Sequence, residues 1–307
     1  MKEFFERLRG DAARISSDVI EKDFHLHRLL HAFSENDYLR GDLVFKGGTC
    51  LVKAYLGYYR FSEDIDFHWK DPDIWKGRTR TAITRECSLE ASTMIDQIKP
   101  IAKSLGMIFE GEKQDKNQVA FRGGGRMVDF NLRYKSEILG IPARIKIQLN
   151  FMDVNFYPFE KVRLNSYIRG PEKIGLRALF EKEYDEYCCE IPFVCYDPRE
   201  IFTEKCRAAL TRKVFKPRDI LDIYKLNEKF GYSVLDFDDE ILDKIQFMIK
   251  VYEKYRDNLE LTEFPAKYAL SEAEEKLVLE DLPDAFSIKA QEIQDQLTEL
   301  KKRIVIE

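Results

Sequence analysis

Residues 45–67 read FKGGTCLVKAYLGYYRFSEDIDF, and this stretch decides the fold. The apolar residues 43–45 lead into the pair Gly47-Gly48, and the sequence predicts a helix that Thr49 caps and that continues to about residue 56. Residues 64–68 (DIDFH) alternate polar and apolar side chains, which predicts a strand. A strand, a glycine-rich helix entry and a second strand are therefore expected in close succession.

The carboxylates of Asp64 and Asp66 are suited to hold a metal ion. Side chains alternate between the two faces of a strand, so both carboxylates project from the same face. Two adjacent carboxylates repel each other unless a cation neutralises them, and Mg²⁺ (or Mn²⁺) binds a few carboxylates together with substrate phosphates. Gly47 and Gly48 let a triphosphate approach the backbone, where a helix N-terminus directs its N–H groups at anionic oxygens. The combination predicts phosphoryl-group chemistry.

The rest of the chain predicts an α+β protein whose first half holds a mixed sheet and whose second half is helical. The expected helices cover residues 11–35 and 79–105, and the expected strands lie near residues 106–110, 117–122, 126–134 and 144–151. Gly123-Gly124-Gly125 predicts a hairpin turn between two of these strands. Ser271 and Glu274 predict a capping box for the last long helix. We expect one domain over residues 1–165 and a mainly helical one over residues 166–307.

The charge distribution is uneven along the chain. The formal net charge is −5, and residues 231–307 carry 10 Lys+Arg against 19 Asp+Glu. Residues 199–218 instead hold seven basic and two acidic residues. Such a run is ordinarily a solvated helix face, and the motifs described above raise the alternative of a surface for phosphate. No apolar run approaches the roughly 20 residues that span a bilayer, and the first 14 residues lack the apolar core of a signal peptide. We therefore expect a cytoplasmic protein without membrane contact.

Three segments resemble the AbiEii-type nucleotidyltransferases, the toxins of bacterial and archaeal toxin–antitoxin and abortive-infection systems. They are residues 46–66 (KGGTCLVKAY and RFSEDID), residues 21–24 (EKDF), and residues 204–224 (EKCRAAL, Arg212 and RDILDIY). The resemblance extends from residue 20 to about residue 226. It implies a polymerase-beta-like nucleotidyltransferase core, followed by a helical domain that closes the active-site cleft.

The resemblance also implies roles for individual residues. The implied catalytic residues are Asp64, Asp66, Lys205 and Asp219. The implied nucleotide-binding residues are Gly47, Gly48, Thr49, Lys53, Ser62 and Arg218, with Arg60 as a further candidate. In this scheme Asp64 and Asp66 hold Mg²⁺ and orient the α-phosphate. Lys205 neutralises phosphate charge, and Asp219 supports Lys205 or the acceptor.

The implied reaction moves a nucleoside monophosphate from a nucleoside triphosphate (NTP) to an acceptor. The resemblance suggests RNA as the acceptor, with a tRNA 3′ end as the best-known type, and a cognate antitoxin encoded nearby. A protein hydroxyl or a small molecule is an alternative acceptor.

A second hypothesis is a degenerate member of the family that binds nucleotide or a partner without turnover. Polymerase-beta-like enzymes usually carry a third carboxylate on a later strand, where this sequence has Gln148. An amide is a poor metal ligand beside a carboxylate and cannot act as a base. Either Asp129 or Asp153 compensates, or two carboxylates suffice, or activity is impaired.

Overall fold

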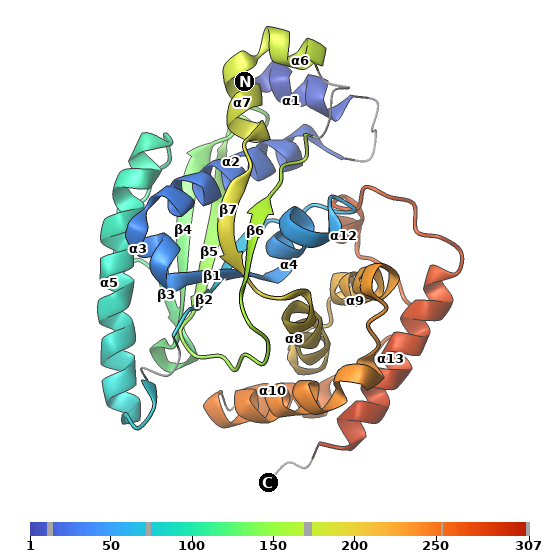
Figure 1. Cartoon of the computed structure of the whole chain (residues 1–307). Coiled ribbons are helices and arrows are strands. Elements are labelled where there is room, and N and C mark those ends of the chain that lie inside the picture. The colour runs from blue at the N-terminus through green and yellow to red at the C-terminus, as the bar shows by residue number, and fades with distance from the viewer. Residues whose placement is uncertain (11–14, 72–74, 169–173, 253, 305–307) are drawn as a thin grey trace. The chain divides into compact units, whose positions relative to one another are not determined.

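A computed structural model describes residues 1–10, 15–71, 75–168, 174–252 and 254–304 of the chain (Figure 1). The chain forms two compact units. The first comprises Met1–Met152 and Phe159–Cys195, and the second comprises Asp153–Pro158 and Tyr196–Glu307. This division differs from the expected boundary between residues 165 and 166, because the strand Ile191–Cys195, which lies beyond that boundary, belongs to the sheet of the first unit.

A mixed seven-stranded sheet forms the framework of the described part of the first unit, in the order β3-β4-β5-β2-β1-β7-β6. The strands are β1 (Leu43–Lys46), β2 (Asp64–Trp69), β3 (Val119–Arg122), β4 (Met127–Lys135), β5 (Pro142–Asn150), β6 (Glu160–Leu164) and β7 (Ile191–Cys195). β1 is antiparallel to β2, whereas β2 runs parallel to β5 and β1 runs parallel to β7. Together with the helices described below, this confirms the α+β class.

The helices of the first unit are α1 (Lys2–Arg9), α2 (Ser17–Glu35), α3 (Asp37–Asp42), α4 (Gly47–Cys50), the π-helix η1 (Leu51–Leu56), α5 (Arg80–Ser104), the short turn η3 (Gly123–Gly125), α6 (Ile174–Leu179) and α7 (Glu181–Cys188). Figure 1 shows α2, α3 and α5 on one side of the sheet. The buried ring of Phe33 on α2 stacks on the buried ring of Phe67 on β2, with 5.9 Å between centroids. The apolar side chains of β2 therefore face the helices, and the alternate side chains face the other way.

This second, polar face of the sheet carries the residues of interest. Asp64 and Asp66 on β2 pair with Lys146 and Gln148 on β5, and Gln148 pairs on its other side with Asp129 on β4. Paired residues on adjacent strands point to the same face. The polar face therefore presents Asp66, Gln148 and Asp129 in one row across three strands.

The second unit is helical, as expected for this part of the chain. Its helices are α8 (Pro198–Thr211), α9 (Pro217–Phe230), η5 (Val234–Phe237), α10 (Asp238–Val251), α11 (Lys254–Leu261), α12 (Glu272–Glu275) and α13 (Phe286–Lys302). The segment Asp153–Pro158 is held to them by Glu200 on α8. The Glu200 carboxylate accepts hydrogen bonds from the backbone N–H groups of Phe156 and Tyr157, and it pairs with buried Lys244 on α10.

Several expected elements differ in detail. The helix expected over residues 11–35 is observed as Ser17–Glu35, and residues 11–14 lie outside the described residues. Near residues 106–110 the described structure has a single bridge, between Ile108 and Arg133. Ser271 and Glu274 do form a capping box, but it begins the four-residue α12 rather than the last long helix. The hairpin expected at residues 123–125 is confirmed by the antiparallel pairing of β3 with β4.

Candidate active site

Gly47 brings the backbone of the helix entry against the carboxylate of Asp66. Lys46, the residue before it, pairs with Asp66 across β1 and β2. Gly47 has φ +76°, and a Cβ built on it would lie 2.5 Å from Oδ2 of Asp66. Both the left-handed backbone and the close contact therefore require glycine at this position. The two predicted halves of the site, the glycine-rich entry and the acid pair, are in direct contact.

Gly48, Thr49 and Ser62 lie together beside this corner. A Cβ on Gly48 would lie 2.6 Å from Nη2 of Arg60 and 3.2 Å from Oγ of Ser62. The Thr49 hydroxyl lies 2.9 Å from Ser62 Oγ and also donates to the backbone carbonyl of Asp64. The expected capping role of Thr49 is wrong, because the helix already begins at Gly47 and the hydroxyl is used to join it to β2. Arg60 is buried rather than exposed.

Asp64 forms an ion pair with Lys146, a residue that the sequence reading did not single out. Lys146 Nζ lies 3.1 Å from Oδ2 of Asp64, and the two side chains are 24% and 35% exposed. At this exposure the pair contributes little to stability, because water screens it. The alternation of residues 144–148 could have placed Lys146 on the same face as Gln148. It could not have placed Lys146 beside Asp64, because β5 and β2, which carry these two residues, lie far apart in the sequence.

Asp129 lies beside Gln148 on the side opposite Asp66, and it is one of the two residues considered as the third carboxylate. It is buried, and Arg122 Nη2 lies 2.7 Å from its Oδ2 atom, while Oδ1 has no hydrogen-bond partner among the described residues. Burial raises the pKa of Asp129, and the charges of Arg122 and Lys146 oppose that shift. Asp153, the other residue considered as a replacement for the third carboxylate, belongs to the second unit, where the Tyr196 hydroxyl lies 3.5 Å from it.

Lys53 lies in the interior of the first unit. Its side chain is 0% exposed, and its Nζ lies 2.9 Å from Oδ1 of Asp23 and 2.6 Å from the Tyr58 hydroxyl. The Tyr187 hydroxyl, on α7, donates to the same Asp23 carboxylate at 2.5 Å. Burial lowers the pKa of Lys53, and the Asp23 carboxylate opposes that shift. The ammonium is thus used inside the fold, and we remove Lys53 from the nucleotide-binding residues expected from the sequence.

In the second unit, Lys205 on α8 connects two buried acids of α9. Its Nζ lies 2.9 Å from Asp219 and 2.6 Å from Asp222, and Arg212 Nε lies 2.7 Å from the other oxygen of Asp219. Burial favours the neutral form of Asp219, but the charges of Lys205 and Arg212 outweigh it and lower the pKa to about 2. Asp219 is therefore ionised at neutral pH, and Arg218 precedes it in the first turn of α9.

The basic stretch 199–218 is largely neutralised within its own unit. Besides Lys205 and Arg212, Arg199 pairs with Asp197 at 2.7 Å, and Arg207 lies 3.7 Å from Glu204. Four of its seven basic side chains thus have acidic partners nearby. This weakens the expectation that the stretch as a whole forms a surface for phosphate.

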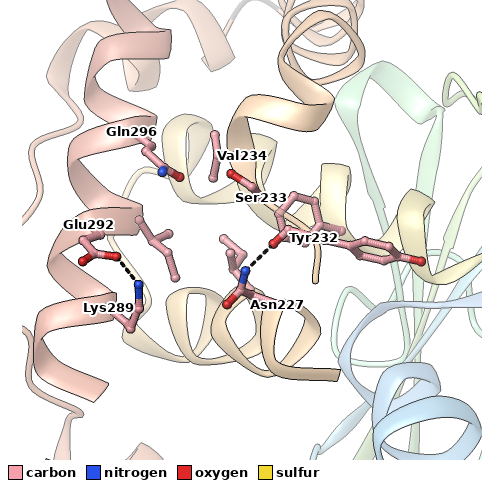
Figure 2. Close-up of a pocket in the computed structure, with 10 residues that line it drawn as sticks. Asn227, Tyr232, Ser233, Val234, Lys289, Glu292 and Gln296 are labelled. Atoms are coloured by element: carbon pink, nitrogen blue, oxygen red, sulfur yellow. Dashed lines mark hydrogen bonds and ion pairs between the residues drawn. The ribbon is translucent and has the colours of Figure 1, made fainter. Parts of the chain in front are cut away.

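A cavity of about 170 Å³ lies in the second unit, between α9, α13 and the segment from Tyr232 to Val234. Figure 2 shows the residues that line it. Its charged lining residues, Lys289 and Glu292, pair with each other at 2.6 Å. The side-chain amide of Asn227 donates to the backbone carbonyl of Tyr232. None of the predicted site residues lines this cavity, and its charges are balanced, so it has none of the features of a phosphate site.

The fold and the Gly47–Asp66 corner define the class of the protein as a nucleotidyltransferase. The family model described as "Nucleotidyl transferase AbiEii toxin, Type IV TA system" matches residues 28–304. The chain therefore belongs to the AbiEii family of nucleotidyltransferase toxins, as the sequence motifs predicted.

The chain is also similar to solved structures. MenT4, a nucleotidyltransferase toxin from Mycobacterium tuberculosis H37Rv, is 21% identical with a TM-score of 0.53, and the alignment covers 97% of this chain and 92% of MenT4. JHP933 from Helicobacter pylori is 14% identical with a TM-score of 0.47, covering 94% of each chain. No curated protein sequence matches the chain significantly. In the described part of the chain, the helices are too short or too polar to cross a bilayer.

Replacing Gly47 by alanine is expected to destabilise the first unit by about 1–2 kcal/mol or more, the cost of a left-handed backbone for a residue with a side chain. The new methyl group also displaces the Asp66 carboxylate, so nucleotide transfer should fall. Gly41 provides the control, because a Cβ on it meets no atom within 4 Å. Gly41→Ala should leave the chain equally or more stable. Thermal unfolding of both variants measures the difference, and equal effects would contradict the assigned contact.

Proposed function

We propose that this toxin transfers a nucleoside monophosphate from an NTP to an RNA acceptor, with a divalent metal ion held by Asp64 and Asp66. The observation that supports this most is the contact between Gly47 and Asp66. It joins a backbone suited to phosphate to a carboxylate suited to a metal ion. In the reaction, an acceptor hydroxyl oxygen bonds to the α-phosphorus, and the bond to the departing pyrophosphate breaks.

The donor set fits Mg²⁺ or Mn²⁺. Asp64 and Asp66 offer two carboxylates from one face of β2, and neither is fully buried. Hard divalent cations accept one or two carboxylates together with substrate phosphates. Lys146 supplies a positive charge beside Asp64 in this structure, and a bound metal ion would share that role as counterion. When bound, the metal ion would neutralise charge on the transferred phosphate.

We assign the other residues by the same reasoning. Gly47, Gly48, Thr49 and Ser62 contact the β- and γ-phosphates of the NTP. Lys205 neutralises phosphate charge, Asp219 holds Lys205 in position through their ion pair, and Arg218 contacts the nucleotide. A tRNA 3′ end is the acceptor that the family resemblance favours, and the cytoplasm supplies both substrates. The family description also implies an antitoxin partner.

A labelling experiment tests the proposal. The protein is incubated with each of the four NTPs, labelled on the α-phosphate, together with total cellular RNA and either MgCl₂ or MnCl₂. We expect label in RNA with at least one NTP, no label from the same NTP labelled on the γ-phosphate, and no reaction after EDTA treatment.

The alternatives give different outcomes. Label in protein would identify a protein hydroxyl as the acceptor and contradict the RNA proposal. Nucleotide binding without transfer of label would support the hypothesis of a degenerate family member that binds nucleotide without turnover. The position of Gln148 between Asp66 and Asp129 favours that hypothesis.

A further inference from the structure

Besides Arg122, which pairs with Asp129, the polar face of the sheet carries three exposed basic side chains beyond the acid pair. They are Arg133 and Lys135 on β4 and Arg144 on β5, and we call them the basic strip. Arg133 pairs with Arg144 across the two strands. Lys135 pairs with Pro142, which lies two residues before Arg144 on β5. All three side chains therefore lie on one face, close to one another.

The basic strip continues directly from the predicted active site. Arg144 precedes Lys146 by two residues on β5, and Lys146 pairs with Asp64 both in register and through its ion pair. Residues two apart on a strand lie roughly 6.6–6.8 Å from each other on the same face, and neighbouring strands lie about 4.8 Å apart. The basic strip thus occupies the two rows that follow the row of Asp64 along the sheet, Arg144 with Arg133 and then Lys135 opposite Pro142.

The charges of the basic strip are not neutralised. Among the described residues, none of its three side chains has a hydrogen bond or an ion pair. The charge of Asp115 interacts with that of Arg133, but the two side chains do not form an ion pair. This contrasts with residues 199–218, where most basic side chains have acidic partners. Unpaired like charges on adjacent strands are unfavourable by themselves, so the basic strip is suited to an anionic ligand.

The fold holds the basic strip in a defined position. The loop after Lys135 is bound to α2 by Glu21, which is fully buried and belongs to the segment of the family resemblance at residues 21–24. Its carboxylate accepts hydrogen bonds from the Ser136 hydroxyl and, at 2.6 Å, from the backbone N–H of Glu137. The end of the β4–β5 hairpin is therefore anchored to the helical layer, and its charged side chains project from a rigid support.

We propose that the basic strip binds the sugar-phosphate backbone of the RNA acceptor, next to the end that receives the nucleotide. This proposal rests on the proposed function, because it takes RNA as the acceptor. An acceptor end at the Asp64–Asp66 pair must continue across the protein surface, and the basic strip offers the repeated positive charges that phosphates require, on the face where the acids lie. The contacts are to the backbone, so they do not select a base sequence.

The test compares RNA binding by two matched triple variants in the absence of NTP. The strip variant is Arg133→Gln, Lys135→Gln and Arg144→Gln. The control variant is Arg85→Gln, Lys99→Gln and Lys103→Gln, three exposed residues of α5. Fluorescence anisotropy with bulk tRNA and with a mixed-sequence single-stranded RNA is measured over a range of salt concentrations. Both variants lose three positive charges. A difference in RNA affinity between them therefore depends on where the lost charges lie and not on the net charge.

We expect the strip variant to bind RNA roughly tenfold more weakly or worse, and its log–log salt dependence to fall by about 2, since each phosphate contact contributes about 0.7 for a single strand. The control variant should bind like the wild type, and both variants should keep wild-type NTP affinity and melting temperature. Unchanged RNA binding by the strip variant would overturn the proposal even if nucleotide transfer is demonstrated, and would favour an acidic protein partner there. Loss of NTP affinity together with RNA affinity, or no RNA binding by the wild type, would also overturn it.

Discussion

Replacing Asp66 by asparagine is expected to lower nucleotide transfer by roughly 10²–10³-fold or more, the loss seen when one preorganised charged or polar group is removed from an active site. Asparagine has almost the same shape as aspartate, so the close packing against Gly47 is preserved. What is lost is the negative charge that attracts the metal ion. The melting temperature should therefore stay near that of the wild type or rise, because one of two neighbouring like charges has been removed.

The measurement is label transfer to RNA under single-turnover conditions, with thermal unfolding recorded on the same samples. Asp96→Asn is the matched control, because Asp96 is an exposed carboxylate on α5. It should keep both full transfer and full stability. If Asp66→Asn retains transfer within about tenfold of the wild type, the metal assignment is wrong.

The local features of the site could be predicted from sequence because they depend on neighbouring residues. The alternation of residues 64–68 placed Asp64 and Asp66 on one face of a strand, and the glycine pair marked the helix entry. Both features are local, and the structure has β2 and α4 at these positions. The fold class followed from the same strand and helix patterns, and the family match confirms the class of protein.

The partners of these residues could not be predicted in the same way. β2 pairs with β5, which lies about 80 residues later, so no local pattern shows that Lys146 meets Asp64 or that Asp129 lies beyond Gln148. β6 and β7 were missed for a related reason. β7 contains Pro192, and its pairing with β1 is limited to Phe45 and Cys195, so only the tertiary fold makes it a strand of this sheet.

Lys53 shows a different limit of sequence reading. A lysine five residues after the second glycine of a helix entry is a reasonable phosphate ligand, and nothing in residues 46–55 indicates that it is buried. Its partner Asp23 lies 30 residues earlier on α2, and Tyr187 lies on α7. In the second segment of the family resemblance, Glu21 to Phe24, Asp23 therefore pairs with Lys53 in the interior, and Glu21 binds the end of the β4–β5 hairpin.

Removing one partner of the Asp23–Lys53 pair is expected to destabilise the first unit by about 3–5 kcal/mol, because the other partner is left as a buried, unpaired charge. Asp23→Asn leaves the Lys53 ammonium with the Tyr58 hydroxyl and no carboxylate. Lys53→Met leaves the Asp23 carboxylate, among the described residues, with only the hydroxyls of Tyr58 and Tyr187. Both single variants should unfold at clearly lower urea concentrations than the wild type.

The double variant Asp23→Asn/Lys53→Met should recover most of this loss, since it removes both charges and keeps the volume of the side chains similar. A double-mutant cycle from urea unfolding gives the coupling energy, which should be favourable and of the order of 1–3 kcal/mol for groups in one network. Additive effects of the two changes would contradict a direct buried ion pair.

The same double variant decides between the two roles of Lys53. If Lys53 acts only inside the fold, the stable double variant binds NTP with wild-type affinity, because no group that touches the nucleotide has changed. If the Lys53 ammonium reaches the triphosphate in the bound state, NTP affinity falls even though the fold is restored. Measuring NTP affinity and unfolding on this one protein separates the effects, which Lys53→Met alone cannot do because it changes stability and charge together. We expect unchanged affinity, since the Lys53 side chain is 0% exposed and Asp23 and Tyr58 hold its ammonium inside the fold.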